Sequence, residues 1–297
     1  MVSIITPVYD RVTLFEQTCK SVLAQTYSDF EWLIIDDGSN EDVKGLLDKF
    51  NDRRIIYFRL PHSGKLPKLR NYGIKNSNGE LIIFLDSDDL WKPNALDAMV
   101  RVLERDNGLG FVVAETEIFR GERTEFSSIY RQEHKINAGK RFFLELFCEQ
   151  DFVFFASSVL FRRSCLDRNG ICDENLLYGD KDFFTRLAFH FKAMITTEVL
   201  IRIRKHDQNV TATLGVNSPA VESIREELYT INYFFMKNFI DAALHKKLSG
   251  FYNFKLAEYY YEAKSFKDAK KMYAKCLKYD SMNMKARIKK IISRVKG

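Results

Sequence analysis

The sequence lacks the signatures of secreted, disulfide-rich and membrane-spanning proteins. Its five cysteines are an odd number without a C-x-x-C pair, which argues against a disulfide framework or a zinc knuckle and favours a reducing cytosol. No basic segment followed by an apolar one opens the chain, so no signal peptide is recognisable. The longest apolar run, 152–161, is far shorter than the roughly 20 residues of a membrane-spanning helix. We therefore expect a cytoplasmic protein, at most peripheral on the inner face of a membrane.

Glycine-rich phosphate loops are also missing. A dinucleotide-binding fold needs a glycine-rich turn after its first strand, so that the backbone can approach the pyrophosphate, but the first glycine of this chain is Gly38. No Walker A sequence occurs either. Any bound phosphate must therefore be met by side chains and a metal ion.

A net positive charge occurs only at the end of the chain. Residues 264–297 hold 12 of the 46 Lys and Arg residues and 2 of the 40 Asp and Glu residues, so the rest of the chain is mildly acidic. Apolar residues recur among these charges at helical spacing, at Ile288, Ile291, Ile292 and Val295. This pattern favours contact with an anionic membrane surface. The alternative is a solvated helix that packs its isoleucines on the rest of the protein. We expect no nucleic-acid partner.

Strand and helix patterns alternate over the first hundred residues. Apolar periodicity predicts strands at 2–6, 32–35, 55–59 and 81–85. Helices are predicted at 13–25, 41–50 and 66–75, and from a first turn at Pro93 to about 104. This β-α-β-α order predicts an α/β fold with a mostly parallel central sheet and helices on both faces.

The remainder of the chain has two different characters. Strands are predicted near 111–118, 153–161 and 194–202, and helices near 139–148 and 180–191. After Asn217-Ser218-Pro219 the pattern becomes all-helical, and 256–277 resembles a single tetratricopeptide repeat. Because a free-standing solenoid normally needs at least about three repeats, one repeat is weak evidence for such an architecture.

Acidic side chains follow three of the predicted strands. They occur at Asp10, at Asp36-Asp37 and at Asp86-Ser87-Asp88-Asp89. In open α/β sheets, ligands bind at the carboxyl ends of the strands. Carboxylates gathered there repel one another, so a cation or a hydrogen-bond donor must offset them. The last cluster offers hard oxygen ligands that suit Mg²⁺ or Mn²⁺. A solvated acidic turn that caps the next helix is the alternative.

Together these features resemble family 2 glycosyltransferases of the GT-A fold. The resemblance rests on VSIITPVYDR (2–11), SVLAQTYSDFEWLIIDDGSNED (21–42), KLRNYGI (68–74), GELIIFLDSDDLW (79–91), YGDKDFFTRLAF (178–189) and RKHDQNVT (204–211). It implies transfer of a hexose from a nucleotide-sugar donor, a UDP-sugar, to an acceptor hydroxyl with inversion. By analogy with bacterial relatives, the acceptor is a glycan or a lipid-linked saccharide in surface-polysaccharide biosynthesis.

The resemblance also implies a donor site, formed by Pro7, Tyr9, Arg11, Asp37, Arg70, Asp86 and Asp88. Tyr9 is expected to stack on uracil, with Arg11 near the same base. Asp37 is expected to accept a hydrogen bond from the base, and Arg70 to lie near the phosphates. The alternatives are a surface aromatic for Tyr9, a turn-forming residue for Asp37 and a helix-surface arginine for Arg70.

Metal and base residues are implied in the same way. Asp88 and Asp89 are expected to share the ribose and the metal ion, with His206 as a further metal ligand that slightly favours Mn²⁺. His206 could instead be a structural histidine. Asp180 matches the family's catalytic base, although many relatives carry Glu-Asp where this chain has Gly179-Asp180. Asp182 is the alternative base, and a plain helix N-cap is the other reading of Asp180.

We accordingly expect two domains. The GT-A domain is predicted at 1–216, with a nucleotide-binding half at 1–95 and an acceptor half at 96–216, and a helical region follows at 217–297. Two other functions compete with sugar transfer. A nucleotidyltransferase that makes nucleotide sugars would carry a glycine- and arginine-rich loop after the first strand, which is absent. A binding protein with a dead site would lack acidic residues that this chain has.

Overall fold

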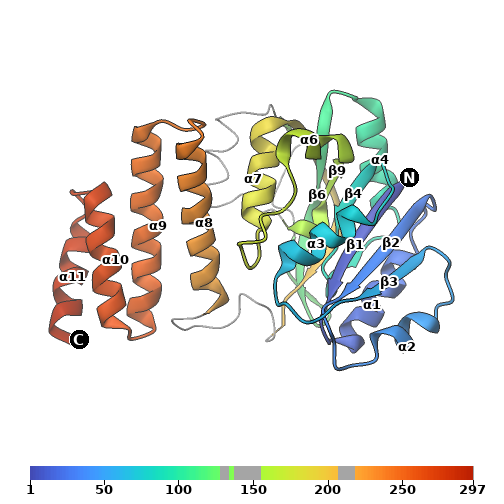
Figure 1. The fold of residues 1–297 in the computed structure, drawn as a ribbon, viewed down its shortest axis with the longest axis horizontal. Helices are drawn as coiled ribbons and strands as arrows, with labels where there is room; N and C mark the ends of the chain where they lie inside the picture. Colours follow the sequence, from blue (N-terminus) through green and yellow to red (C-terminus); the bar gives the residue numbers. More distant parts are fainter. Residues whose placement is uncertain (128–133, 137–154, 207–217, 297) are drawn as a thin grey trace. The chain divides into compact units, whose positions relative to one another are not determined.

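The computed structural model describes residues 1–127, 134–136, 155–206 and 218–296. The chain divides into two compact units, Met1–Lys205 and His206–Gly297 (Figure 1). The predicted boundary at 216 stays a prediction, because 207–217 lie outside the described residues.

The first unit is built on a mixed sheet with the strand order β3-β2-β1-β4-β9-β6-β10-β5. Its first four strands are β1 (Val2–Val8), β2 (Phe30–Asp36), β3 (Ile55–Arg59) and β4 (Leu81–Phe84). These four strands pair in parallel, as predicted. Every residue of β1 and β2 is buried, which is typical of strands covered on both faces. The carboxyl ends of the four strands therefore meet at one edge (Figure 1).

The second half of the sheet mixes strand directions. It consists of β5 (Leu90–Trp91), β6 (Leu109–Arg120), β7 (Arg123–Ser127), β8 (His134–Ile136), β9 (Val159–Arg162) and β10 (Lys192–Arg204). β9 lies antiparallel between β4 and β6, whereas β6 and β10 are parallel. The strand predicted at 153–161 needs correction, because Ala156–Ser158 form a 3-10 turn and the strand begins only at Val159. The helix predicted at 139–148 lies outside the described residues.

Helices cover both faces of this sheet. They are α1 (Val12–Leu23), α2 (Val43–Asp48), α3 (Leu66–Lys75), α4 (Ala95–Arg105), α6 (Leu166–Asn169) and α7 (Asp180–His190). Side chains of α1, α2 and α4 form one core with Ile4, Trp32 and Ile83. The helix predicted to include Pro93 begins later, at Ala95, because the short strand β5 comes first.

The other face of the sheet receives α3 and α7. Phe183 and Phe184 of α7 pack their rings on Phe84 of β4, with centroids 5.5 and 6.2 Å apart. Gly73 lets α3 approach β1, since a Cβ at that position would lie 2.3 Å from the Ile5 side chain. Both α3 and α7 therefore pack on the sheet face opposite the one that α1, α2 and α4 cover.

The second unit is helical throughout its described part, as predicted. It contains α8 (Pro219–Met236), α9 (Ala242–Glu262), α10 (Phe266–Tyr279) and α11 (Met284–Lys296). The predicted two-helix pattern is confirmed, because Leu256 and Tyr260 of α9 and Ala269 and Tyr273 of α10 are buried. Among the described helices, none is long and apolar enough to cross a membrane.

Candidate functional site

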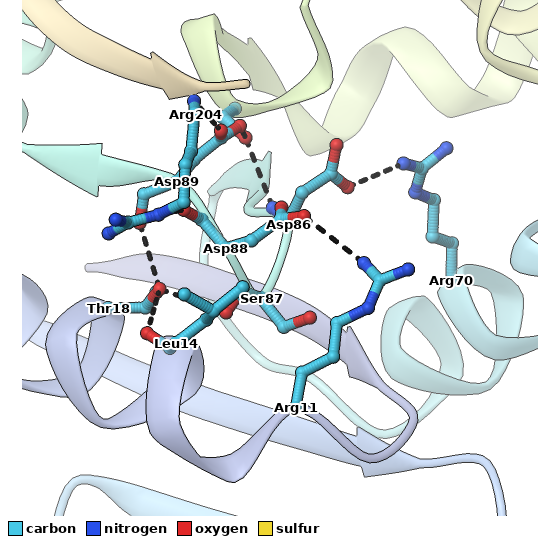
Figure 2. A network of polar contacts seen from close by, with 10 residues as sticks. Arg11, Leu14, Thr18, Arg70, Asp86, Ser87, Asp88, Asp89 and Arg204 are labelled. Carbon is cyan, nitrogen blue, oxygen red and sulfur yellow. Dashed lines mark hydrogen bonds and ion pairs between the residues drawn. The ribbon is translucent and has the colours of Figure 1, made fainter. Parts of the chain in front are cut away.

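Asp86, Ser87, Asp88 and Asp89 form a turn directly after β4, which we call the acidic turn (Figure 2). Its backbone is held from one side by α1, since Thr18 Oγ1 lies 3.0 and 2.9 Å from the carbonyl oxygens of Ser87 and Asp89. Arg204, the last residue of β10, donates from Nε to the carbonyl of Asp88 at 2.8 Å. The turn is therefore fixed by elements far apart in the sequence.

Both carboxylate oxygens of Asp89 are anchored by hydrogen bonds. Ser157 Oγ donates to its Oδ2 at 2.6 Å, and the backbone N–H of Arg204 donates to its Oδ1 at 3.1 Å. Ser157 Oγ also accepts a hydrogen bond from the Asp86 backbone at 3.1 Å. Burial raises the pKa of Asp89 well above its usual value, and the neighbouring charges of Asp88 and Asp86 add to the shift.

Two arginines reach the remaining carboxylates. Arg11 Nη1 lies 3.1 Å from Asp88 Oδ2, and Arg70 Nη2 lies 3.2 Å from Asp86 Oδ1 (Figure 2). Desolvation by the surrounding protein raises the pKa of Asp86, although Arg70 opposes this shift. The acidic turn therefore concentrates negative charge that arginines only partly offset.

Arg11 owes its position to an unusual backbone. Asp10 and Arg11 both have positive φ, 54° and 63°, a left-handed conformation that costs roughly 1–2 kcal/mol for a residue with a Cβ. The Asp10 carboxylate offsets this cost by accepting hydrogen bonds from the backbone of Asn40 at 2.7 Å and Glu41 at 3.0 Å. The bond to Glu41 is the main reason that the pKa of Asp10 is lowered. Arg11, expected near the base, lies against Asp88.

The residues expected to bind the base lie together at the ends of β1 and β2. Tyr9 is exposed, and its ring lies 4.3 Å from that of His62 with an interplanar angle of 30°. Asp37 is buried and accepts hydrogen bonds at 2.8 Å from the backbone of Ser63 and of Gly64. It therefore holds the segment that carries His62. Pro7 is buried within β1.

Asp180 is the first residue of α7, as predicted, and Gly179 occupies the N-cap. Gly179 has a positive φ of 68°, and a Cβ there would lie 2.7 Å from Pro67 Cγ. A glutamate at this position would therefore be strained and would collide with α3. Asp180 forms an ion pair with Arg70 Nη1, which joins the start of α7 to the acidic turn.

Asp182 differs from Asp180 in its surroundings. It is buried, and its Oδ2 accepts hydrogen bonds from Arg186 Nε at 2.9 Å and Nη2 at 2.7 Å. Arg186 in turn donates to the carbonyl oxygens of Asn169 and Ile171. This pair has a structural role, because it fastens the segment before α7 to the helix.

Asn71 fixes the same segment from α3. Its Nδ2 donates to the carbonyl of Cys172 and to Glu174 Oε1, both at 2.9 Å, and its Oδ1 accepts from the Cys172 backbone at 2.9 Å. The adjacent Arg70 contacts Asp180. Two adjacent residues of α3 therefore hold the start of α7. Arg70 contacts Asp180 directly, and Asn71 fixes the segment before α7.

A preformed metal centre is not present among the described residues, since no three His, Cys, Asp or Glu side chains converge there. His206 is half-buried and follows β10 by two residues, at the start of the second unit. The metal roles of Asp88, Asp89 and His206 stay predictions.

Ser157, Thr18 and Arg204 are site residues that the sequence did not reveal. Arg204 belongs to the RKHDQNVT motif and therefore carried a signal, but only His206 was singled out from that motif. Ser157 carried none, since it lies inside an apolar run that reads as a strand.

Comparisons with known proteins find related sequences and structures. The model of the family described as "Glycosyl transferase family 2" matches residues 3–168. An uncharacterized glycosyltransferase of Rickettsia bellii is 43% identical over 121 residues, which are 40% of this chain and 17% of that protein. The uncharacterized glycosyltransferase RT0329 of Rickettsia typhi is 29% identical over 215 residues, 72% of this chain and 66% of that protein. The Escherichia coli enzyme WfgD, named a UDP-Glc:alpha-D-GlcNAc-diphosphoundecaprenol beta-1,3-glucosyltransferase, is 33% identical over 40% of this chain and 46% of its own.

Solved structures share the fold. Staphylococcus aureus TarS 1-349, in complex with UDP-GlcNAc, has a TM-score of 0.68 at 17% identity, with 98% of this chain and 88% of that chain covered. The mannosyltransferase PcManGT of Pyrobaculum calidifontis, with GDP-Man and Mn²⁺, has a TM-score of 0.60 at 13% identity, with 99% and 84% covered. The family model spans more than half of the sequence, and the match to the TarS structure covers 98% of the chain. The chain therefore belongs to glycosyl transferase family 2 and has the GT-A fold.

Proposed function

We propose that this chain transfers one hexose from a UDP-sugar to a hydroxyl group of a saccharide acceptor, with inversion at the anomeric carbon. The observation that carries the proposal is the position of Arg70, whose guanidinium contacts Asp86 of the acidic turn and Asp180 at the start of α7. Arg70 therefore contacts both the turn that is expected to bind the donor and the residue that is expected to act as the base. At the ends of β1 and β2, the exposed ring of Tyr9 is available to stack on a nucleotide base, while both oxygens of Asp37 already accept backbone hydrogen bonds.

In the proposed reaction, the acceptor hydroxyl attacks the anomeric carbon on the face opposite the diphosphate, so a single displacement inverts that carbon. Asp180 accepts the hydroxyl proton, because its side chain is 34% exposed at the start of α7. Asp182 is unsuited to this role, since it is buried and paired with Arg186. Arg70 offsets charge that develops on the leaving diphosphate.

A divalent cation fits the chemistry of the acidic turn. Burial and neighbouring carboxylates raise the pKa values of Asp86 and Asp89, which marks negative charge that a cation would offset. Mg²⁺ is commonly held by one or two carboxylates together with phosphate oxygens, so a larger preformed set of protein ligands is not required. We propose Mn²⁺ or Mg²⁺ held by Asp88, with Asp89 as a further ligand, while the metal role expected of His206 stays a prediction. Such an ion would stabilise negative charge on the leaving diphosphate.

The donor is tested by a panel of nucleotide sugars. UDP-glucose, UDP-GlcNAc and GDP-mannose are titrated against the full chain in the presence of Mn²⁺. We expect saturable binding of a UDP-sugar and release of UDP when an acceptor is added. TarS, which has the same fold, was solved with UDP-GlcNAc, and WfgD is named for a UDP-Glc donor. Binding of GDP-mannose alone would overturn the UDP proposal, and release of pyrophosphate would indicate a nucleotidyltransferase.

The proposed acceptor is a lipid-linked saccharide in polysaccharide biosynthesis. WfgD is named for a diphosphoundecaprenol-linked GlcNAc acceptor, and the Bacillus subtilis relative TuaG, 32% identical over 37% of this chain, is named for teichuronic acid biosynthesis. A synthetic saccharide on a diphosphate lipid tests this proposal against the same saccharide without the lipid. Equal transfer to both would show that the lipid is not recognised.

A lipid-linked acceptor agrees with peripheral contact through α11. Ile288 and Ile291 of this helix are 53% and 65% exposed, and the exposed Arg287 and Arg294 lie on the same helix. The opposite side of α11 is buried at Ala286 and Ser293. Exposed isoleucines among cations are typical of a helix at an anionic membrane surface, where each cation contributes roughly 1 kcal/mol.

A further inference from the structure

Arg70 is the most completely buried charged side chain of the candidate site. It is 1% exposed, and its guanidinium carbon lies 5.0 Å above the Phe84 ring. One terminal nitrogen pairs with Asp180 and the other with Asp86. Within the described residues, its Nε has no hydrogen-bond partner. Two carboxylates therefore bind the terminal nitrogens of the guanidinium, and its Nε is left without a hydrogen bond within the described residues.

The two carboxylates belong to opposite parts of the proposed reaction. Asp86 follows β4 on the donor side, and Asp180 begins α7 as the proposed base. Their side chains are 38% and 34% exposed, so a ligand can reach both, whereas Arg70 enters from the buried side of α3. A carboxylate paired with a guanidinium is a poorer proton acceptor, because the cation stabilises its ionised form.

We propose that Arg70 couples donor binding to release of the base. Without donor, Arg70 pairs with Asp180 and holds it inactive. The donor diphosphate presents more negative charge and more acceptor oxygens than one carboxylate, so it competes for the same guanidinium. As Arg70 turns toward the diphosphate, Asp180 loses its partner and can accept the proton of the acceptor hydroxyl. This inference rests on the proposed function and makes Arg70 a positioning residue for the base.

The coupling predicts a specific order of events. Because ligands that compete for one side chain must influence each other reciprocally, the Arg70–Asp180 pair weakens diphosphate binding to the same extent that the diphosphate weakens the pair. If the acceptor binds before the donor, Asp180 is still paired with Arg70. If the donor binds first, Asp180 is free to accept the proton of the acceptor.

The test is a double-mutant cycle read out by binding of UDP alone, in the presence of Mn²⁺. Calorimetry gives the Kd of UDP for the full chain, Asp180→Asn, Arg70→Ala and the double variant. Asp180→Asn should bind UDP about fivefold more tightly or better, since Asn does not compete for the guanidinium and couplings between sites commonly start at about this size. In the Arg70→Ala background the same substitution should leave the Kd unchanged.

In the Arg70→Ala background, Asp180 and the diphosphate no longer compete for Arg70. Any tightening by Asp180→Asn in that background therefore comes from the loss of repulsion between Asp180 and the diphosphate. An equal tightening in both backgrounds, or no tightening by Asp180→Asn, would overturn the proposal. Arg70→Lys with and without Asp180→Asn replaces the alanine arm if alanine prevents folding, and there the tightening should be smaller than with arginine. Asp52→Asn removes the same charge from a carboxylate that pairs with Arg54 away from the acidic turn, and it should not tighten binding. If the unaltered chain binds no UDP, the proposed function fails before the coupling is tested.

Discussion

Ser157 Oγ donates a 2.6 Å hydrogen bond to Asp89 Oδ2 across 68 positions of sequence. The same oxygen accepts a hydrogen bond from the backbone of Asp86, so one hydroxyl joins both ends of the acidic turn. The proposed sugar transfer depends on the geometry of that turn, so Ser157 is as informative a target for mutation as the carboxylates themselves.

Ser157→Ala should reduce transfer by about tenfold, because the loss of one hydrogen bond to a charged group of about 1.5–3 kcal/mol loosens the turn. The midpoint of thermal unfolding should also fall. Initial rates with the preferred UDP-sugar and a thermal melt measure the two effects. Ser158→Ala is the matched control, since the Ser158 hydroxyl bonds to the Phe155 carbonyl instead. If the two variants behave alike, Ser157 has no special role at the turn.

Chelation of divalent cations should abolish transfer, and Asp88→Asn should largely do the same, because Asp88 is the proposed metal ligand. Rates are measured after treatment with excess chelator and again after Mn²⁺ or Mg²⁺ is restored. Asp52→Asn is a control for the loss of one carboxylate, since Asp52 pairs with Arg54 away from the acidic turn. Full activity in excess chelator would contradict the metal proposal.

Asp180→Asn should lower kcat by at least about 10²-fold, the usual contribution of a general base. Binding of the UDP-sugar should persist. Asp182→Asn should act on stability, because breaking a buried ion pair costs about 3–5 kcal/mol. Single-turnover rates and melting temperatures of both variants distinguish the two roles. A folded Asp182→Asn variant with the larger loss in rate would show that the base is assigned wrongly.

Asp89→Asn should alter the pH dependence of stability in the absence of metal. The pKa of Asp89 is raised in the folded protein by burial, so its ionisation opposes folding. The wild-type chain therefore loses stability as pH rises from the unfolded-state pKa, about 3.9, through the raised folded-state pKa. The variant lacks this loss. Relative to wild type, its free energy of unfolding should rise between pH 4 and pH 7, measured by urea denaturation in chelator. A difference that does not change with pH would contradict this expectation.

The chain should bind vesicles that contain anionic lipid and release them as salt concentration rises. Ile288→Ser combined with Ile291→Ser should weaken binding without unfolding the helices, because both side chains are exposed. Co-sedimentation measures the bound fraction, and a chain that ends at residue 280 should not bind. Met236→Ser is the matched control, since Met236 is an exposed apolar residue of α8. Equal binding to neutral vesicles would contradict electrostatic attachment.

Local sequence patterns predicted the strands and helices of the first half, although β1 and β2 are longer than predicted. β3 and α3 have their predicted bounds, and Asp180 begins α7 as expected, because apolar periodicity and turn residues are properties of short segments. The pairing of Arg70 with Asp180 could not be predicted, since it depends on how α3 and α7 pack on the sheet. Ser157 was missed for a related reason. Its segment reads as a strand, and only the fold shows that a 3-10 turn presents the hydroxyl to Asp89.

Glu258 neutralises part of the positive charge in the C-terminal helix α11. It lies on α9 and accepts ion pairs from Lys285 at 3.2 Å and Lys289 at 2.7 Å, while the same lysines lie over the rings of Phe254 and Tyr261. Lys285 and Lys289 therefore attach α11 to α9 through Glu258. The charge that remains for an outside partner is smaller than a count along the sequence suggests, and the salt dependence of any attachment will reflect that smaller number.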